Sequence, residues 1–175
     1  MKTVVIYKSK SGFVKKYAEW ITQEISADIF DAAKVSSSIF DSYDTVIYGG
    51  GLYVSGINGV KLITNNLPKL AGKKVIVFAS GATPPREEDI KKVWDMNFTV
   101  EQQKQIRLFY MRGGFDYNRL TLVDKVLMNM LKWKIRLKRS SERVADERGM
   151  LAAYDKPMDF TRKQNIEELV AYANS

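Results

Sequence analysis

Short apolar runs alternate with stretches of helical periodicity along most of the chain. Five runs rich in β-branched and aromatic residues predict strands at residues 3–7, 27–30, 45–48, 75–79 and 105–111. Apolar residues recur at helical spacing in residues 14–25, 59–70 and 87–94. This alternation predicts an α/β fold, in which helices cover both faces of a five-stranded parallel sheet. We expect the third strand to stop at Gly49, where a run of three glycines begins.

The composition is that of one ordinary globular domain. The chain has 175 residues, of which 45% are hydrophobic and 27% are charged. No internal repeat or low-complexity linker divides it, so we expect a single domain over residues 1–175. The net charge of +8 makes acidic small molecules, anionic membrane surfaces and nucleic acid the candidate partners.

The chain contains neither Cys nor His. This excludes a thiol nucleophile, a Ser-His-Asp relay, a histidine general base and a thiolate or imidazole zinc site. We therefore expect no metal centre and no hydrolysis by the common triads. We see no export signal, and no apolar run approaches the roughly 20 residues that a spanning helix needs. A cytoplasmic protein is the expectation.

The loop after the first strand has the composition of an anion site. Ligands of open parallel sheets bind where the strands end and the helices begin. Hydroxyl groups, a flexible glycine and free helix N–H groups together suit a terminal phosphate. The loop comprises Ser9, Lys10, Ser11, Gly12, Phe13 and Val14. The alternative is that Ser9 and Ser11 only cap the helix. Neither G-x-x-x-x-G-K-[ST] nor G-x-G-x-x-G occurs in the chain.

Three segments resemble flavodoxins in the expected order along the chain. Residues 4–14 resemble the first strand and its phosphate loop, and residues 43–53 resemble the third strand and the loop whose aromatic residue stacks on the flavin ring. Residues 75–84 are similar to the fourth strand and the second flavin loop. The resemblance implies a flavodoxin-like three-layer α/β/α fold and FMN bound without a covalent link.

The resemblance also implies which residues contact FMN. They are Ser9, Lys10, Ser11, Gly12, Phe13 and Val14 in the first loop, Gly51, Leu52, Tyr53, Val54 and Ser55 in the second, and Ser80, Gly81, Ala82, Thr83 and Pro84 in the third. Tyr53 would cover one face of the flavin ring. The alternative is that Tyr53 is an ordinary aromatic residue of the loop. Phe13 and Val14 depart from the amide and hydroxyl residues of the family, so two hydrogen bonds to phosphate would be missing, with Lys10 as an electrostatic substitute.

The second half of the chain resembles a subfamily, the flavodoxin-type, menaquinone-dependent protoporphyrinogen oxidases. The resemblance lies in residues 113–120, in the apolar and basic stretch that follows, and in a final helix opening near Met158. It implies an extra helical segment before the last helix, at about residues 114–157. It also implies an FMN-dependent oxidoreductase with a porphyrin or quinone substrate and no assigned catalytic side chain. The alternatives are an electron-carrier flavodoxin and a flavodoxin-like binding domain without FMN.

A basic, amphipathic stretch begins at Leu120 and ends at Arg143. Residues 132–143 contain six basic residues and a single acidic one, Glu142. The apolar residues ahead of them form a broad face at helical spacing, a pattern typical of a helix at a membrane interface. We therefore expect an anionic membrane surface as partner and a peripheral location at the inner face of the membrane. The alternatives are a helix packed on its own domain or, over residues 133–138, an extended edge. Because only one aromatic residue lies among the charges, nucleic acid is not an expected partner.

Overall fold

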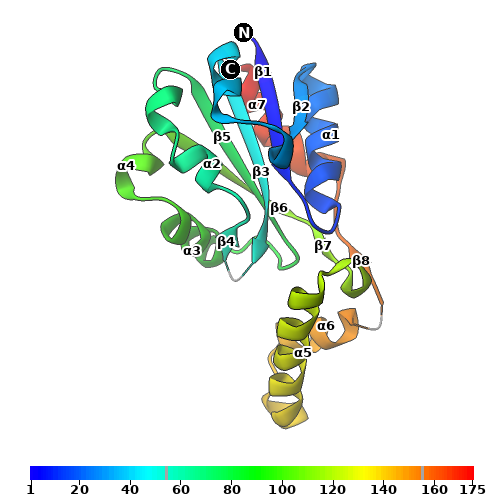
Figure 1. Ribbon diagram of the computed structural model, residues 1–175. Helices are drawn as coiled ribbons and strands as arrows, with labels where there is room; N and C mark the ends of the chain where they lie inside the picture. Colours follow the sequence, from blue (N-terminus) through cyan, green and yellow to red (C-terminus); the bar gives the residue numbers. More distant parts are fainter. Residues whose placement is uncertain (54, 155) are drawn as a thin grey trace.

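Residues 1–53, 55–154 and 156–175 are described by the computed structural model. The parallel strands are β1 (Thr3–Lys8), β2 (Asp28–Asp31), β3 (Thr45–Tyr53), β5 (Lys74–Gly81) and β6 (Ile106–Arg112). They form one sheet in the order β2-β1-β3-β5-β6, which confirms the predicted five-stranded parallel sheet (Figure 1). A short strand, β4 (Gly56–Ile57), pairs antiparallel with the end of β3.

Helices cover both faces of the sheet, as predicted. On one face lie α1 (Phe13–Ile25) and α7 (Glu167–Asn174), and on the other lie α2 (Lys61–Thr64) and α3 (Glu87–Asn97), followed by α4 (Val100–Gln103) (Figure 1). Shorter 3-10 helices span Ala32–Lys34, Ser37–Ser42, Leu67–Leu70, Tyr117–Arg119, Ser140–Glu142 and Lys163–Ile166. The three-layer α/β/α arrangement is therefore the observed one.

Two apolar cores lie between the sheet and its helices. Successive residues of a strand point to opposite faces, so Val5 packs in the core beneath α1 and α7, while Val4 and Ile6 pack in the other. All three side chains are fully buried. A parallel sheet that is covered on both faces requires apolar residues on both, which is why its strands are continuous apolar runs in the sequence.

The predicted end of β3 at Gly49 is wrong, because the strand continues through the glycines to Tyr53. Gly49 to Gly51 remain in register with β5, and Gly49 lies opposite Phe78. A Cβ atom on Gly49 would lie only 2.1 Å from Cζ of the buried Phe78 ring. The glycines therefore do not break the strand; at Gly49, the missing side chain makes room for an aromatic ring.

The helix predicted at residues 59–70 is shorter than expected. Only Lys61–Thr64 is α-helical, and a 3-10 helix at Leu67–Leu70 follows it. Pro68 contributes to the interruption, since it lacks the N–H group that a continuous α-helix would donate to the carbonyl oxygen of Thr64; it lies instead in the first turn of the 3-10 helix.

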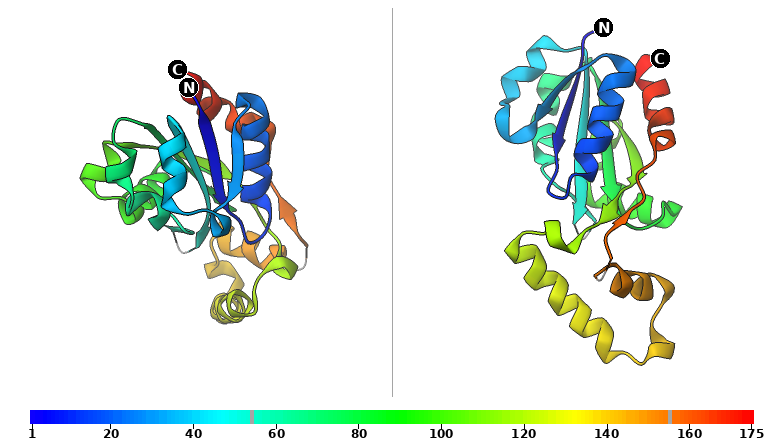
Figure 2. Two further views of the ribbon diagram at one scale, coloured as in Figure 1. Left: turned by 45° about the horizontal axis from the view of Figure 1, so that its top comes forward. Right: turned by 90° about the vertical axis from the view of Figure 1, so that its right-hand side faces the viewer.

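An inserted helical segment leaves the sheet after β6. Strands β7 (Gly114–Phe115) and β8 (Met158–Asp159) pair antiparallel at its root. Between them lie α5 (Leu122–Leu137) and α6 (Ala145–Ala153), which project beyond the carboxyl end of the sheet (Figure 2). Within the described ranges, no helix is long and apolar enough to cross a bilayer.

Two details of this region differ from the predictions. The last helix does not open near Met158; it begins at Glu167, because Met158 belongs to the strand pair that closes the inserted segment. The extended alternative for residues 133–138 is also wrong, since α5 continues to Leu137.

We predict that Gly49→Ala destabilises the protein by about 1–3 kcal/mol, because the new methyl group would overlap the Phe78 ring in a core that cannot easily move. Equilibrium unfolding in urea measures this change. Gly149→Ala is the matched control, because a Cβ at that helical position would have no described atom within 4 Å apart from its chain neighbours and its own helix backbone. Alanine there should leave the free energy of unfolding unchanged or raise it by up to about 1 kcal/mol. Equal stability of the two variants would contradict the packing at Gly49.

Candidate functional site

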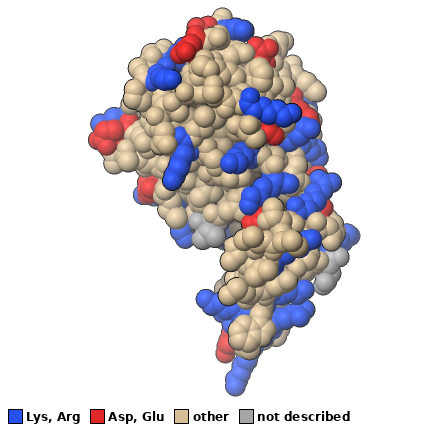
Figure 3. Space-filling view, viewed as in Figure 1, with Lys and Arg blue, Asp and Glu red and all other residues tan. Residues whose placement is uncertain are grey.

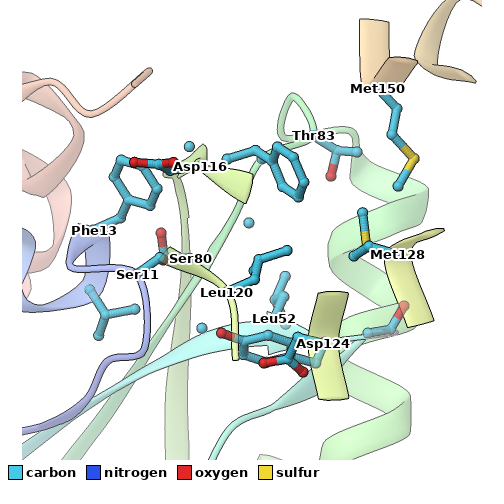
Figure 4. A pocket seen from close by; sticks show the side chains of 18 of the residues that line it. Ser11, Phe13, Leu52, Ser80, Thr83, Asp116, Leu120, Asp124, Met128 and Met150 are labelled. Carbon is cyan, nitrogen blue, oxygen red and sulfur yellow. The ribbon is translucent and has the colours of Figure 1, made fainter. Parts of the chain in front are cut away.

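A cavity of about 570 Å³ lies at the carboxyl end of the sheet (Figure 4). The loops that follow β1, β3 and β5 form its inner wall, and α5 and α6 form its outer wall. Figure 4 shows Met128 of α5 and Met150 of α6 on the side of the space opposite Phe13. The parallel strands end at one edge of the sheet, so three loops that are distant in sequence meet around one space.

The first loop presents the start of α1 to the cavity. Gly12 has a left-handed conformation, with φ of +94°, and its N–H donates to Oγ of Ser9 at 3.1 Å. No side chain caps α1, and its first turn contains no acid. Gly12, and not Ser9 or Ser11, occupies the capping position of α1, and Ser9 accepts only the N–H of that glycine. The first N–H groups of an α-helix have no partner within the helix, so this end of α1 can hold an anion.

Lys10 links the first loop to α5. Its Nζ atom lies 2.8 Å from a carboxylate oxygen of Asp124 and 4.4 Å from the centre of the Tyr53 ring. The hydrogen bond from Lys10 is the main reason that the pKa of Asp124 is below its usual value. Burial, and to a smaller extent the Asp124 carboxylate, raise the pKa of Tyr53 to about 12. Tyr53 is therefore neutral at physiological pH, and Lys10 is already paired with an acid.

Arg119 forms a second link between the inserted segment and the first loop. Its Nη1 atom donates to the carbonyl oxygen of Ser11 at 3.0 Å, while its Nε atom lies 3.2 Å from Asp116. A Cβ atom on Gly12 would lie 3.0 Å from the same Nη1 atom. The guanidinium group thus lies directly against the proposed phosphate loop, a position that the sequence analysis did not assign to it.

The second loop is held in place by Asn97 of α3. The Asn97 side chain accepts a hydrogen bond from the N–H of Ile57 and donates one to the carbonyl oxygen of Ser55, both at 2.7 Å. Ser55 has a positive φ of 65°, a conformation that is uncommon for residues other than glycine. The contacts of Asn97 with Ser55 itself and with Ile57, two residues later, stabilise this conformation.

The third loop is held by side chains of β6. The hydroxyl of Tyr110 donates to the carbonyl oxygen of Thr83 at 2.9 Å, and Nε of Arg112 donates to the carbonyl oxygen of Ala82 at 3.2 Å. The N–H of Gly113 also donates to the carbonyl oxygen of Gly81 at 2.7 Å. The backbone of this loop is therefore fixed from the neighbouring strand.

The structure brings most of the predicted site residues together. Those that line the cavity are Ser11, Phe13, Val14, Gly51, Leu52, Tyr53, Ser55, Ser80, Gly81, Ala82 and Thr83. Ser9, Lys10, Gly12 and Pro84 are not part of its lining. Val54 lies outside the described residues. Ser9, Lys10 and Gly12 still shape the first loop through the contacts given above, whereas Pro84 belongs to the turn that leads into α3.

Phe13 and Val14 have packing roles. Val14 is almost fully buried in the core beneath α1. Phe13 packs against the root of the inserted segment, since a Cβ atom on Gly114 would lie 2.6 Å from Cζ of its ring. The two substitutions that depart from the flavodoxin pattern thus join the first loop to the core and to the inserted segment.

Sequence reasoning missed the outer wall of the cavity. Its residues on α5 and just before it share helical spacing: Leu120, Asp124, Leu127, Met128 and Leu131. The signal that could have found them is an acid, Asp124, within an otherwise apolar stripe, in a chain whose first loop carries a cation, Lys10, with no acid near it in the sequence. The broad apolar face alone did not indicate which side of the helix faces the sheet.

Comparison with known proteins identifies the fold. The solved structure of a WrbA-like flavodoxin from Agrobacterium tumefaciens aligns with a TM-score of 0.50 and 16% identity, over 71% of this chain and 87% of that protein. The Trp repressor binding protein of Bacillus subtilis aligns with the same TM-score and identity, over 64% and 85%. At such low identity these likenesses establish the fold alone.

Two sequence comparisons extend this finding. An uncharacterized protein of Methanocaldococcus jannaschii is 33% identical over 87 residues, which span 48% of this chain and 57% of that relative. The match thus spans little more than half of the relative's length. The flavodoxin domain family matches residues 4–142, which include all of the sheet but its first residue, together with α5. Since this match covers most of its 175 residues, the chain belongs to the flavodoxin domain family.

Proposed function

We propose that this chain binds FMN in the cavity and is an FMN-dependent oxidoreductase. The observation that carries the proposal is that one cavity joins the uncapped start of α1 to the loop that bears Tyr53. Its volume lies within the usual range of small-molecule sites, roughly 300–1,000 Å³. Flavodoxins and WrbA-like flavoproteins bind FMN, and membership of the family supports the same cofactor here.

The chain's own residues would divide the binding between two ends of the cavity. FMN, when bound, supplies electron or hydride transfer, and the protein supplies orientation and charge. The N–H groups at the start of α1 would hold the phosphate. Tyr53 would cover one face of the ring, and backbone N–H groups of residues 52–55 and 81–83 would bind its polar edge. No side chain has to act as a general base, which agrees with a chain that lacks His and Cys.

The charges in the cavity are compatible with an anionic cofactor. Asp116 and Asp124 both line the cavity, and an unpaired carboxylate there would repel a phosphate. Each is instead paired with a cation, Asp116 with Arg119 and Asp124 with Lys10. Lys10 belongs to the first loop and Arg119 lies against it, so the two cations supply positive charge beside the start of α1.

Oxidation of protoporphyrinogen IX with a menaquinone acceptor is the specific activity that we propose. The subfamily resemblance carries this choice, and the apolar outer wall supports it. Leu127, Met128 and Leu131 of α5 line the cavity together with Leu52 and Tyr53, a lining suited to a flat, apolar substrate. In this proposal the whole chain is one domain, and residues 114–157 form the substrate side of the site, at the inner face of the membrane.

We expect the protein to bind FMN with a stoichiometry of one, because among the described residues a single cavity joins the start of α1 to the loop that bears Tyr53. A fluorescence-quenching titration of the apoprotein, followed by an absorption spectrum, measures this. Protoporphyrinogen IX with a menaquinone analogue then tests turnover. FMN binding without turnover would favour the electron-carrier alternative. A colourless protein that quenches no FMN fluorescence would overturn both redox functions and leave a binding domain.

We expect Arg119→Gln to weaken FMN binding about fivefold, corresponding to about 1 kcal/mol for an exposed, charge-assisted contact. Binding of riboflavin, which lacks the phosphate, should not change. Arg148→Gln removes an equal charge from exposed α6 and serves as the control. Parallel titrations of both flavins measure the effects. An equal loss of FMN and riboflavin affinity would mean that Arg119 shapes the cavity and does not act on the phosphate.

A further inference from the structure

Helix α5 exposes a long apolar stripe that the cavity does not use. The stripe consists of Leu122, Val126, Met130, Trp133 and Leu137, whose spacing of three or four residues places them on one side of the helix. Their side chains are 60–82% exposed. Figures 1 and 2 show α5 projecting away from the sheet, so the body of the protein does not cover this side. We call these five residues the outer stripe.

The inner side of α5 is fixed, so the outer stripe has a defined orientation. Ile135 is buried, and Asp124 and Met128 face the cavity. The hydroxyl of Tyr154, just after α6, donates to the carbonyl oxygen of Met128 at 2.5 Å. Thr121 caps the start of the helix by accepting the N–H of Asp124. With its inner side held by these contacts, α5 cannot bury the outer stripe by rotating about its axis.

Positive charge accompanies the outer stripe. Lys134, Arg136 and Arg139 are exposed on or directly after the last turns of α5. The acid within α5 is Asp124, which lies on the inner side and is paired with Lys10. Figure 3 shows more Lys and Arg than Asp and Glu around the projecting part of the molecule. An exposed apolar stripe flanked by cations is typical of a helix that lies in a membrane interface.

We propose that α5 docks on an anionic phospholipid bilayer, with the outer stripe among the acyl chains and the flanking cations at the headgroups. A helix of 16 residues is about 24 Å long, and α5 would lie in the plane of the surface. Trp133, in the C-terminal half of the stripe, has the amphipathic ring that favours the headgroup level. A second copy of the chain is disfavoured as the occupant, because it would bring the same cations face to face. The outer stripe takes no part in the lining of the cavity, so this proposal stands or falls independently of FMN binding.

Sedimentation with vesicles tests the docking of the full chain, with and without added FMN. We expect the protein to bind vesicles of phosphatidylcholine mixed with phosphatidylglycerol at least about tenfold more tightly than vesicles of phosphatidylcholine alone. Added salt should weaken binding to the anionic vesicles, because it screens the cations. Equal binding to both kinds of vesicle, or binding to neither, would overturn the proposal.

A matched pair of variants locates the contact. Met130→Gln lies in the outer stripe, and Met96→Gln lies on α3; the two methionines are 63% and 58% exposed, so neither substitution disturbs the core. Met130→Gln should weaken binding to anionic vesicles several-fold, and Met96→Gln should not. Lys134→Gln combined with Arg136→Gln should reduce the preference for anionic over neutral vesicles. A similar effect of both methionine variants would contradict docking through α5.

The oligomeric state of the free protein separates lipid from a second copy. We expect the wild-type chain to remain monomeric in light-scattering measurements at concentrations that saturate the vesicles. A dimer that dissociates in Met130→Gln, together with no binding to vesicles, would show that the outer stripe joins two copies, and the membrane proposal would be wrong.

Discussion

The pairing of β3 with β1 on one side and β5 on the other determines where every functional element of this protein lies. In register, Lys8 at the end of β1 pairs with Gly50, and Gly51 pairs with Ser80 near the end of β5. The three strands therefore end almost level, and their loops meet at one edge. The glycines in β3 keep this pairing intact where the Phe78 ring needs space.

The inserted segment is attached to this edge by polar contacts with the first loop. Lys10 pairs with Asp124, and Arg119 donates to the carbonyl oxygen of Ser11. These contacts place α5 across the carboxyl end of the sheet, where it closes one side of the cavity. One helix thus serves two surfaces: its inner side belongs to the cavity and its outer side to the solvent or, in our proposal, to lipid.

The strands could be predicted because buried parallel strands are continuous apolar runs in the sequence. The order of the strands is also restricted, because only a few sheet topologies are possible when strands alternate with helices. The loops of the site followed from that topology. Two predictions fail for local reasons: a run of glycines usually ends a strand, but packing against Phe78 requires Gly49 within β3, and Pro68 interrupts a helix whose apolar spacing is regular. The outer wall of the cavity could not be predicted. Which side of α5 faces inward depends on partners far away in sequence, Lys10 among them.

Leu127 and Leu131 belong to both surfaces of α5, since they line the cavity and are also partly exposed to solvent. The apolar surface is therefore continuous from the cavity to the outside of the helix. For a protein seated on a bilayer through α5, a hydrophobic molecule dissolved in the lipid would reach the cavity by lateral diffusion, without passing through water. The concentration that matters for such a ligand is then its mole fraction in the membrane.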